Sequence, residues 1–369
     1  MYDAVVIGAG ISGSVTSKIL AEKNYNVLLV DRETPPRDKA CSGVQLGYME
    51  KLIGAKIPEK VLCSNKLNRI HLTTPSGRSI EGRVSLLNYW RRDFDLWLNQ
   101  LAIDAGVETR WGAELTGIKQ DSSGVIATID GEEIQTQYII GADGLSPTAF
   151  TRRHIFPDNY SKQVTGASLN YYYHGESTTK PDTLYLYYRK NISDLMYSWL
   201  YHKDDTIVVG TSSTQNLNQY AQEFLETVKN QFNLDGEEIS REGFSTHFKG
   251  GVKLGNKNVL LVGDAAGLLD LYRGVGMDSA ALSGRICALS IINALENRKN
   301  ALKVYSYKMR KLVKMIETNA IKQEKRFKSD KAIEKTLAPT NITIAQTQIL
   351  LTQIWNRFCK PEKMRLLPP

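Results

Sequence analysis

The stretch "DAVVIGAGISGSVTSKILAEKNYNVLLVDR", residues 3–32, decides the fold. It contains two short apolar runs, at 4–7 and 27–30, and between them a segment, 11–23, whose apolar residues recur at helical spacing. This pattern predicts a buried strand, a helix and a second strand. A Gly-x-Gly-x-x-Gly turn, made by Gly8, Gly10 and Gly13, connects the first strand to the helix. The opening of the chain therefore predicts a βαβ unit with a glycine-rich turn.

Each of the three positions in this turn requires a glycine for a physical reason. Gly8 permits the tight turn, Gly10 lets the backbone approach a pyrophosphate, and Gly13 lets the helix pack closely on the strand. The free N–H groups at the helix start then face the diphosphate. An acidic side chain at the end of the second strand can accept hydrogen bonds from ribose hydroxyls. We predict a dinucleotide site made by Gly8, Gly10, Ile11, Ser12, Gly13, Asp31 and Arg32, and this pattern alone leaves NAD and FAD open.

Two distant segments add to this site. Residues 138–150, "YIIGADGLSPTAF", contain an apolar run that ends near Asp143. Residues 258–285, "NVLLVGDAAGLLDLYRGVGMDSAALSGR", contain a second such run that ends in Gly263 and Asp264. A short loop follows it, and the sequence Gly274-Val275-Gly276-Met277 then opens a long helical pattern. Both runs predict buried strands that end in polar, glycine-rich loops.

These motifs resemble the para-hydroxybenzoate hydroxylase-type superfamily of FAD-dependent monooxygenases and reductases. The resemblance implies FAD as the cofactor, with Asp264 at the ribitol hydroxyls and the loop of Gly274 and Gly276 against the isoalloxazine ring. It also implies that Arg91, which opens a helix in "WRRDFDLWLNQLAIDAGVE", lies near the FAD, although the neighbouring Arg92 fits the pattern equally well. Because the chain contains one dinucleotide fingerprint, we expect an external electron donor, either NAD(P)H or an electron carrier.

The region 158–246 contains apolar and aromatic residues in period-two alternation, which predicts an antiparallel sheet. We therefore predict an α/β fold: a Rossmann-like FAD-binding domain with an inserted antiparallel β-sheet substrate domain and C-terminal helices. In this division the FAD-binding domain has three parts and the substrate domain two, followed by a helical region. The boundaries are 1–70, 89–157 and 247–298 for FAD, 71–88 and 158–246 for the substrate, and 299–369 for the helices.

A narrower resemblance comes from "LMYSWLYHKDDTIVVGTSS", residues 195–213, which is similar to the YxWxFPK…VGxG signature of the geranylgeranyl reductase family. The matching residues are Tyr197, Trp199, Lys203 and Gly210, whereas Tyr201-His202 replaces the usual Phe-Pro. Two more family motifs have counterparts in Cys41-Ser42-Gly43 and Ser283-Gly284-Arg285, and Leu271 replaces a proline. The resemblance covers about residues 1–300.

This resemblance implies that Cys41, Ser42 and Gly43 lie near the flavin, under the substrate sheet. Reduction of an alkene needs a hydride and a proton, and a thiol is a suitable proton donor, so Cys41 is the candidate catalytic residue. The alternative is that Cys41 is a small side chain in a tight loop. The expected substrate pocket comprises Tyr197, Trp199, His202 and Arg273, with Arg273 placing positive charge near the flavin or a phosphate.

The function that the resemblance implies is FAD-dependent reduction of carbon–carbon double bonds in an isoprenoid lipid or pigment precursor. One alternative is an FAD-dependent monooxygenase or halogenase of an aromatic or apolar substrate. The other is a flavoprotein that passes electrons to a quinone. We expect an apolar small-molecule or lipid substrate, no metal and no nucleic acid.

Composition and charge place further limits. Four scattered cysteines without ligand spacing argue against a zinc site and favour a reducing, cytoplasmic location. The opening lacks the basic region and cleavage site of a signal peptide. Residues 299–335 contain twelve basic and four acidic residues, which accounts for the net charge of +8. This amphipathic segment is expected to dock its apolar stripe on the protein, or to contact the inner face of a membrane peripherally. Residues 336–369 predict a further apolar helix.

Overall fold

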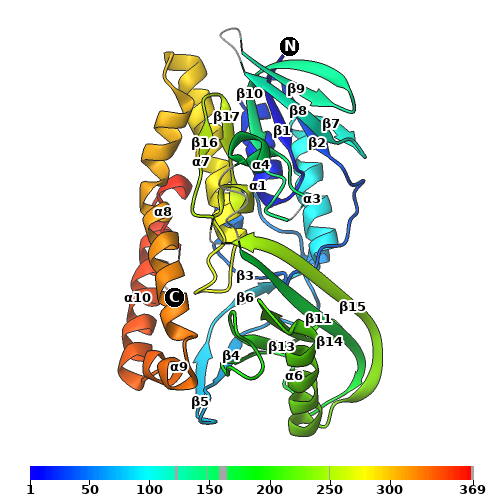
Figure 1. Cartoon of the computed structure of the whole chain (residues 1–369), viewed down its shortest axis with the longest axis vertical. Helices are drawn as coiled ribbons and strands as arrows, with labels where there is room; N and C mark the ends of the chain where they lie inside the picture. The colour runs from blue at the N-terminus through cyan, green and yellow to red at the C-terminus, as the bar shows by residue number, and fades with distance from the viewer. Residues whose placement is uncertain (121–123, 147, 158–163, 249, 367–369) are drawn as a thin grey trace.

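The computed structural model describes residues 1–120, 124–146, 148–157, 164–248 and 250–366. An eight-stranded sheet forms the half of the molecule that contains the N-terminus (Figure 1). Its five central strands run parallel, in the order β17 (Val259–Leu261), β10 (Glu132–Gly141), β1 (Tyr2–Ile7), β2 (Val27–Asp31) and β7 (Glu108–Trp111). Antiparallel strands extend it: β16 (Gly255–Asn256) beside β17, and β8 (Leu115–Gln120) and β9 (Val125–Ile129) beside β10.

The two faces of this sheet follow from the alternation of side chains along β1. Ala4 and Val6 pack in the core that the helices form on one face, whereas Val5 and Ile7 pack in the core formed with the β8–β9 hairpin. Both faces are therefore buried, which explains why the strand is a continuous apolar run. The helices on the first face are α1 (Ile11–Ala21), α2 (Met49–Ile53), α3 (Arg91–Asp104) and α7 (Met277–Asn297).

A seven-stranded sheet forms the other half of the molecule. Its order is β15 (Asp235–Phe248), β11 (Val164–Glu176), β14 (Thr206–Ser213), β13 (Ser198–Lys203), β12 (Thr183–Tyr187), β4 (Arg69–Thr73) and β5 (Ser79–Arg83). The predicted antiparallel sheet is present with one exception, because β12 and β4 pair in parallel. A two-stranded sheet, β3 (Val44–Leu46) with β6 (Leu86–Asn88), lies in the segment that connects the halves.

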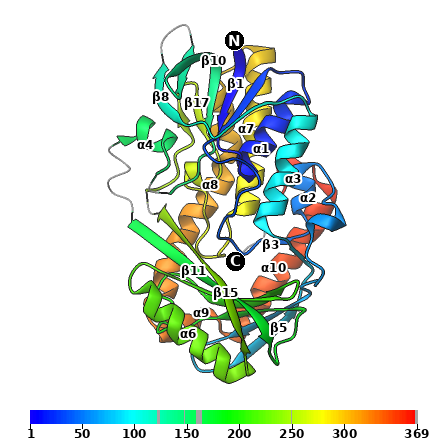
Figure 2. The ribbon, with the colours of Figure 1, turned by 90° about the vertical axis from the view of Figure 1, so that its right-hand side faces the viewer.

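One helix of this half was not expected from the sequence. Helix α6 (Leu217–Phe232) lies across the outer side of the second sheet (Figure 2). It buries Ala221, Phe224, Leu225 and Val228 against that sheet. These four residues have the spacing of one helical face, so hydrophobic periodicity was a signal that could have revealed it.

The C-terminal region is helical, as expected. Helix α8 (Ala301–Arg326) descends from the first half to the second, α9 (Asp330–Thr336) lies there, and α10 (Pro339–Phe358) returns (Figure 1). The predicted stripe of α8 is docked, since Tyr305, Met309, Leu312 and Ile316 are buried in the main core. The remaining short elements are η1 (Glu59–Val61), α4 (Thr151–Ile155), η2 (Gly263–Ala266) and η3 (Pro361–Lys363). Among the described helices, none combines the length and the apolarity that crossing a bilayer requires.

Replacing Tyr305 by alanine tests the docking of α8. Tyr305 is fully buried, and its hydroxyl donates a hydrogen bond to the Leu261 carbonyl oxygen at 3.0 Å. Tyr305→Ala should lower the free energy of unfolding by about 3–5 kcal/mol, because it leaves a cavity beneath α8. Tyr307, two residues further on, is 66% exposed, and Tyr307→Ala is the matched control. Equal urea unfolding midpoints for the two variants would contradict this packing.

Candidate functional site

The carboxyl ends of β1, β2 and β10 meet at one edge of the first sheet. Asp31, the last residue of β2, accepts a hydrogen bond from the Ala9 N–H at 2.7 Å. Its carboxylate therefore holds the glycine turn that precedes α1, so the predicted acid and the predicted turn form one structure. Ala142, just after β10, lies beside the same turn, because its N–H donates to the Ile7 carbonyl oxygen at 2.7 Å.

A cavity of about 1360 Å³ opens at this edge and extends between the two sheets. The glycine turn, the loop that follows β2, the loop 269–278 and the inner face of the second sheet line it. Its far end is lined by α10. The cavity therefore joins a polar part beside the first sheet to an apolar part beside the second.

Most of the predicted site residues line this cavity. They are Gly8, Gly10, Ile11, Ser12, Asp31, Arg32, Cys41, Ser42, Arg91, Asp143, Tyr197, Trp199, Asp264, Arg273, Gly274, Val275, Gly276 and Met277. Four others do not belong to the lining, namely Gly13, Gly43, His202 and Gly263.

Position 43 requires a glycine for the conformation of the backbone and not for contact with the cavity. Its backbone has a positive φ of 57°, and a Cβ there would lie 1.9 Å from the Tyr89 carbonyl oxygen. The Gly43 carbonyl oxygen in turn accepts a hydrogen bond from the Tyr89 N–H at 3.0 Å. The glycine therefore allows the loop of Cys41 to lie against the strand β6 and the start of α3.

Asp143 lines the cavity, but its carboxylate is committed elsewhere. One oxygen accepts hydrogen bonds from the N–H groups of Phe150 and Thr151, both at 2.8 Å. Burial raises the pKa of this carboxyl group. Asp143 thus caps the start of α4 through this oxygen, and its role at the cofactor stays a prediction.

Arg37 was missed in the sequence, and its guanidinium lies beside the glycine turn. A Cβ on Gly10 would lie 3.5 Å from the Arg37 Nη2, which donates to the Asp95 carboxylate at 3.3 Å. The Arg37 Nε–H is buried and has no hydrogen-bond acceptor in the described part of the chain. This Nε lies 4.0 Å from the Asp31 carboxylate, so the Arg37 cation is held between that carboxylate and the glycine turn. A cation beside a helix N-terminus fits a diphosphate group. Together with the carboxylates of Asp31 and Asp264, which can accept hydrogen bonds from hydroxyl groups, this set of residues fits FAD.

Arg91 and Arg92 are distinguished by burial. Arg91 is buried and lines the cavity, whereas Arg92 is exposed. The Arg91 guanidinium forms two hydrogen bonds with the Asp95 carboxylate, at 2.9 and 2.8 Å. Burial alone would raise the pKa of Asp95, but the ion pair with Arg91 outweighs it and lowers that pKa.

Cys41 lies between this ion pair and the start of α7. Its Sγ is 3.8 Å from the Met277 Sδ, and the Arg91 side chain interacts with the thiol. The next residue is held by the second sheet, because the Tyr201 hydroxyl donates to the Ser42 carbonyl oxygen at 3.3 Å. Lys203 donates to the Tyr89 carbonyl oxygen, and burial lowers the pKa of this lysine to about 8. The loop of Cys41 is therefore fixed beneath the second sheet.

The strand β13 forms part of the cavity roof. Trp199 donates its indole N–H to the Asn170 side-chain oxygen at 2.8 Å, and its ring lies edge-on to that of Tyr197, with centroids 6.3 Å apart. Tyr201, which the sequence analysis assigned no role, also lines the cavity. These residues alternate along the strand, so they share one face.

The expected place of His202 in the substrate pocket is wrong. His202 is an even-numbered residue of β13, so its side chain points to the other face of the strand from Trp199 and Tyr201. Its Nε2 lies 2.6 Å from the Thr179 hydroxyl oxygen, away from the cavity. Burial lowers the pKa of this histidine. The alternation of Trp199, Tyr201 and Lys203 was the signal that could have excluded it.

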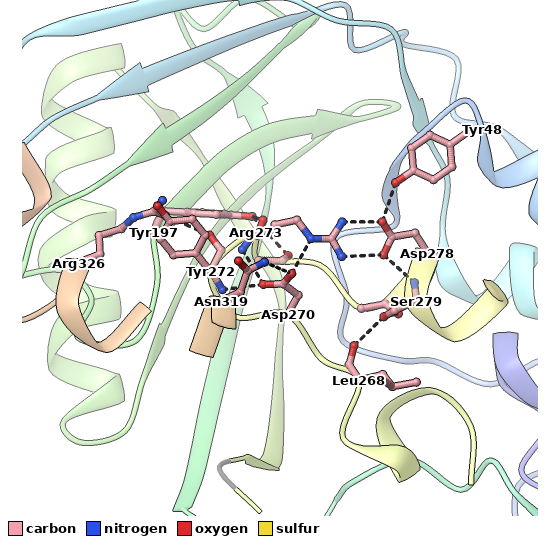
Figure 3. A network of polar contacts seen from close by, with 12 residues as sticks. Tyr48, Tyr197, Leu268, Asp270, Tyr272, Arg273, Asp278, Ser279, Asn319 and Arg326 are labelled. Atoms are coloured by element: carbon pink, nitrogen blue, oxygen red, sulfur yellow. Dashed lines mark hydrogen bonds and ion pairs between the residues drawn. The ribbon is translucent and has the colours of Figure 1, made fainter. Parts of the chain in front are cut away.

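A buried polar network holds the glycine loop before α7 (Figure 3). The Arg273 guanidinium donates to the Asp270 carboxylate at 2.7 Å and to the Asp278 carboxylate at 2.8 Å. Asp270 also accepts from the Asn319 amide of α8 at 2.7 Å, and Asp278 from the Tyr48 hydroxyl at 2.6 Å. Arg273 was expected to supply positive charge to the flavin or a phosphate, but two carboxylates compensate that charge.

The same network fixes the loop backbone from the cavity side. The Tyr197 hydroxyl donates to the Arg273 carbonyl oxygen at 3.2 Å. Gly274 has a positive φ of 68°, and a Cβ there would lie 2.1 Å from the Tyr197 hydroxyl oxygen. On the other side, Arg326 donates to the Tyr272 carbonyl oxygen at 3.0 Å and stacks on the Tyr272 ring. The loop is therefore held from α2, α7, α8 and the second sheet.

Comparison with known proteins identifies this architecture. A family model described as an FAD binding domain matches residues 1–320. Among curated relatives, the geranylgeranyl diphosphate reductase of Rhodobacter capsulatus is 29% identical, over 81% of this chain and 77% of the relative. The digeranylgeranylglycerophospholipid reductase 3 of Methanosphaera stadtmanae is 24% identical, over 95% of this chain and 94% of the relative.

Solved structures share the fold. A geranylgeranyl bacteriochlorophyll reductase-like protein from Thermoplasma acidophilum superposes with a TM-score of 0.77 at 20% identity, covering 90% of each chain. A variant of the halogenase PltM in complex with FAD superposes with a TM-score of 0.74 at 14% identity. That likeness covers 96% of this chain and 82% of the halogenase. At these identities the structures indicate a common fold and do not distinguish reactions.

Replacing Asp270 by asparagine tests the network around the glycine loop. The variant removes one of the two charges that hold Arg273 and weakens the contact to Asn319. Because a hydrogen bond to a charged group contributes about 1.5–3 kcal/mol, FAD should bind the apoprotein at least about tenfold more weakly. The measurement is a titration of apoprotein followed by FAD fluorescence. Asp205→Asn, at an exposed carboxylate, is the control, and unchanged affinity in Asp270→Asn would contradict the role of the network.

Proposed function

The chain belongs to the FAD-binding domain family and is an FAD-dependent oxidoreductase, and from this premise we propose that it reduces carbon–carbon double bonds of an isoprenoid chain. The substrate that we propose is a geranylgeranyl-type lipid or pigment precursor. Electrons come from an external donor, either NAD(P)H or an electron carrier.

The apolar end of the cavity supports this proposal. Aliphatic side chains from β4, β5, β12 and α10 line it, and it is continuous with the part that contains Cys41 and the glycine loop. A long, weakly polar chain fits such a space, because each buried methylene gains free energy from leaving water. The aliphatic lining residues of this part are Ile70, Leu72, Ile80, Leu184, Leu186, Ile342 and Ile349. The reductases of geranylgeranyl compounds to which this chain is similar support the same class of substrate.

Saturation of a double bond adds a hydride to one carbon and a proton to the other. Asp31, Arg37, Asp264 and the glycine loop would hold FAD, which in its reduced form would supply the hydride. The protein must supply the proton and exclude water from the reacting carbons. Tyr197 and Trp199 exclude water, since they cover the loop from the side of the substrate sheet.

We assign the proton to the Cys41 thiol. It lies at the start of α7, beside the Met277 sulfur, in the part of the cavity that the glycine loop borders. When the thiol gives its proton to the substrate carbon, the resulting thiolate is next to the Arg91 guanidinium, which stabilises its negative charge. Solvent returns the proton after product leaves. Burial raises the pKa of Tyr197, and its hydroxyl is engaged with the Arg273 carbonyl, so this phenol is a poorer donor.

The test is an anaerobic half-reaction. Dithionite-reduced, FAD-loaded protein is mixed with geranylgeranyl diphosphate, and flavin reoxidation is followed together with the mass of the lipid. Reoxidation coupled to the gain of two hydrogens by the lipid is the expected result. Flavin that stays reduced until oxygen is admitted, with oxygen or halide entering the product, would overturn the proposal in favour of an oxygenase or a halogenase. Fast reduction of a quinone with no change in the lipid would overturn it in favour of electron transfer.

Replacing Cys41 by alanine tests the proton donor. Cys41→Ala should retain FAD, because the contacts of Asp31 and the glycine loop are unaffected, and should lose about 10²–10⁴ of the turnover rate. FAD content is measured from the visible spectrum and turnover from lipid mass. Cys359 is also half-buried but lies outside the cavity, so Cys359→Ala is the matched control. Full turnover in Cys41→Ala would reduce the cysteine to a small side chain in a tight loop.

A further inference from the structure

Helix α10 has an unusual surface for the outermost helix of a protein. Its twenty residues include one charged side chain, that of Arg357. Six large apolar side chains of this helix are exposed by between 44% and 80%: Ile344, Leu350, Leu351, Ile354, Trp355 and Phe358. Exposed apolar residues that gather on one element, rather than being scattered singly, indicate an interaction surface.

The exposed apolar residues form a continuous stripe. Ile344, Leu351, Trp355 and Phe358 follow one another at intervals of seven, four and three residues, which places them on one face of the helix. Ile354 extends the same face, and Leu350 lies at its edge, where it also lines the cavity. The stripe faces away from the protein, because the opposite side of α10, with Ile342, Ala345 and Ile349, is half-buried and lines the cavity.

Cations lie at both ends of this stripe. Three exposed lysines precede the helix, and four exposed basic residues follow Phe358 or lie next to it: Lys328, Lys331, Lys335, Arg357, Lys360, Lys363 and Arg365. The same stretch contains three acids, and two of them are occupied by other contacts. Glu334 accepts a hydrogen bond from the Ser76 N–H at 2.6 Å, and Asp330 accepts one from the Lys190 N–H at 2.9 Å.

The contrast with α8 shows which surface is free. The apolar stripe of α8 is buried against the core, and its lysines lie on the solvent side. In α10 the arrangement is reversed, since the large apolar side chains point outward and the charges lie at the two ends. A helix that is apolar outward and cationic at its ends matches the boundary between the headgroups and the acyl chains of an anionic bilayer. Trp355 lies near the C-terminal group of cations, and tryptophan is a residue type that favours this boundary.

We propose that α10 docks this protein on the surface of an anionic lipid bilayer. The stripe of Ile344, Leu351, Trp355 and Phe358 enters the headgroup boundary, and the flanking lysines and arginines contact the anionic headgroups. The sequence analysis placed a membrane contact at 299–335, on the lysine face of α8. We assign the contact to α10 instead, because docking on a membrane needs apolar contact area in addition to charge.

Docking through α10 also places the cavity beside the membrane. One face of the helix meets the bilayer, and the other lines the apolar end of the cavity. An acyl or isoprenoid chain could then pass from the bilayer to the cavity around one helix, without crossing water. This last step rests on the proposed function, whereas the docking rests on the surface of α10 alone.

Cosedimentation with vesicles tests the proposal. FAD-loaded full-length protein is mixed with phosphatidylcholine vesicles with and without phosphatidylglycerol. We expect binding to the anionic vesicles, weakened by added salt. The double variant Leu351→Gln with Phe358→Gln should bind at least about tenfold more weakly, because it removes two membrane-facing side chains. Leu96 and Ile239 are exposed by 40% and 54% on α3 and β15, so Leu96→Gln with Ile239→Gln is the matched control.

Two kinds of result would overturn the proposal. The first is equal vesicle binding by the two double variants, or no binding of the unmodified protein to anionic vesicles. The second is a dimer, seen by light scattering, that the α10 variant converts to monomers while vesicle binding is absent, because the stripe is then an interface between two copies. An unchanged FAD spectrum verifies that each variant is folded. Since the vesicles contain no isoprenoid substrate, the result does not depend on the reaction.

Discussion

The guanidinium of Arg273 joins the elements that hold the glycine loop at the cavity. It lies between two buried carboxylates, and the site therefore holds one more negative than positive charge. Other donors compensate, because Asp278 also accepts from the Tyr48 hydroxyl and from the Ser279 N–H at the start of α7. Burial alone would raise the pKa of Asp278, but Arg273 outweighs it and lowers that pKa. Removing Arg273 would leave two buried carboxylates without their cation, and this makes the loop geometry stringent.

A chain of contacts connects this loop to the roof of the cavity and then to the loop of Cys41. Tyr197 holds the loop from above, and the alternation of β13 brings Trp199 and Tyr201 to the same face. Tyr201 in turn reaches the backbone of Ser42. The thiol of Cys41 is thus positioned from two sides, by the substrate sheet and by the ion pair of Arg91 with Asp95. Both halves of the molecule have to be in place before the candidate proton donor has a fixed position.

The sequence was most informative where one short segment contains all the residues that define a feature of the site. The glycine turn, Asp31 and Asp264 could be placed because strand, turn and acid are neighbours in the chain. The alternation of side chains along β13 also shows that His202 points to the other face of the strand from Trp199 and Tyr201. Its inclusion in the predicted pocket could therefore have been avoided from the sequence. By contrast, the choice of Arg91 over Arg92 and the proximity of Arg37 to Gly10 depend on packing between distant segments. The parallel pairing of β12 with β4 likewise joins residues more than a hundred positions apart, for which local patterns hold no signal.

The order of strands in the first sheet has a consequence for biosynthesis. The strand β1 is made first, yet its neighbour β10 begins at Glu132, and the next strand, β17, begins at Val259. Most of the second sheet is translated between β10 and β17, and the edge of β1 that faces away from β2 leaves the ribosome long before its partner β10 exists. Contacts of such sequence separation form slowly, and exposed strands of this kind are prone to aggregate. The nascent chain is therefore a natural client for chaperones, and its cofactor-binding half becomes complete only after α7 has been synthesised.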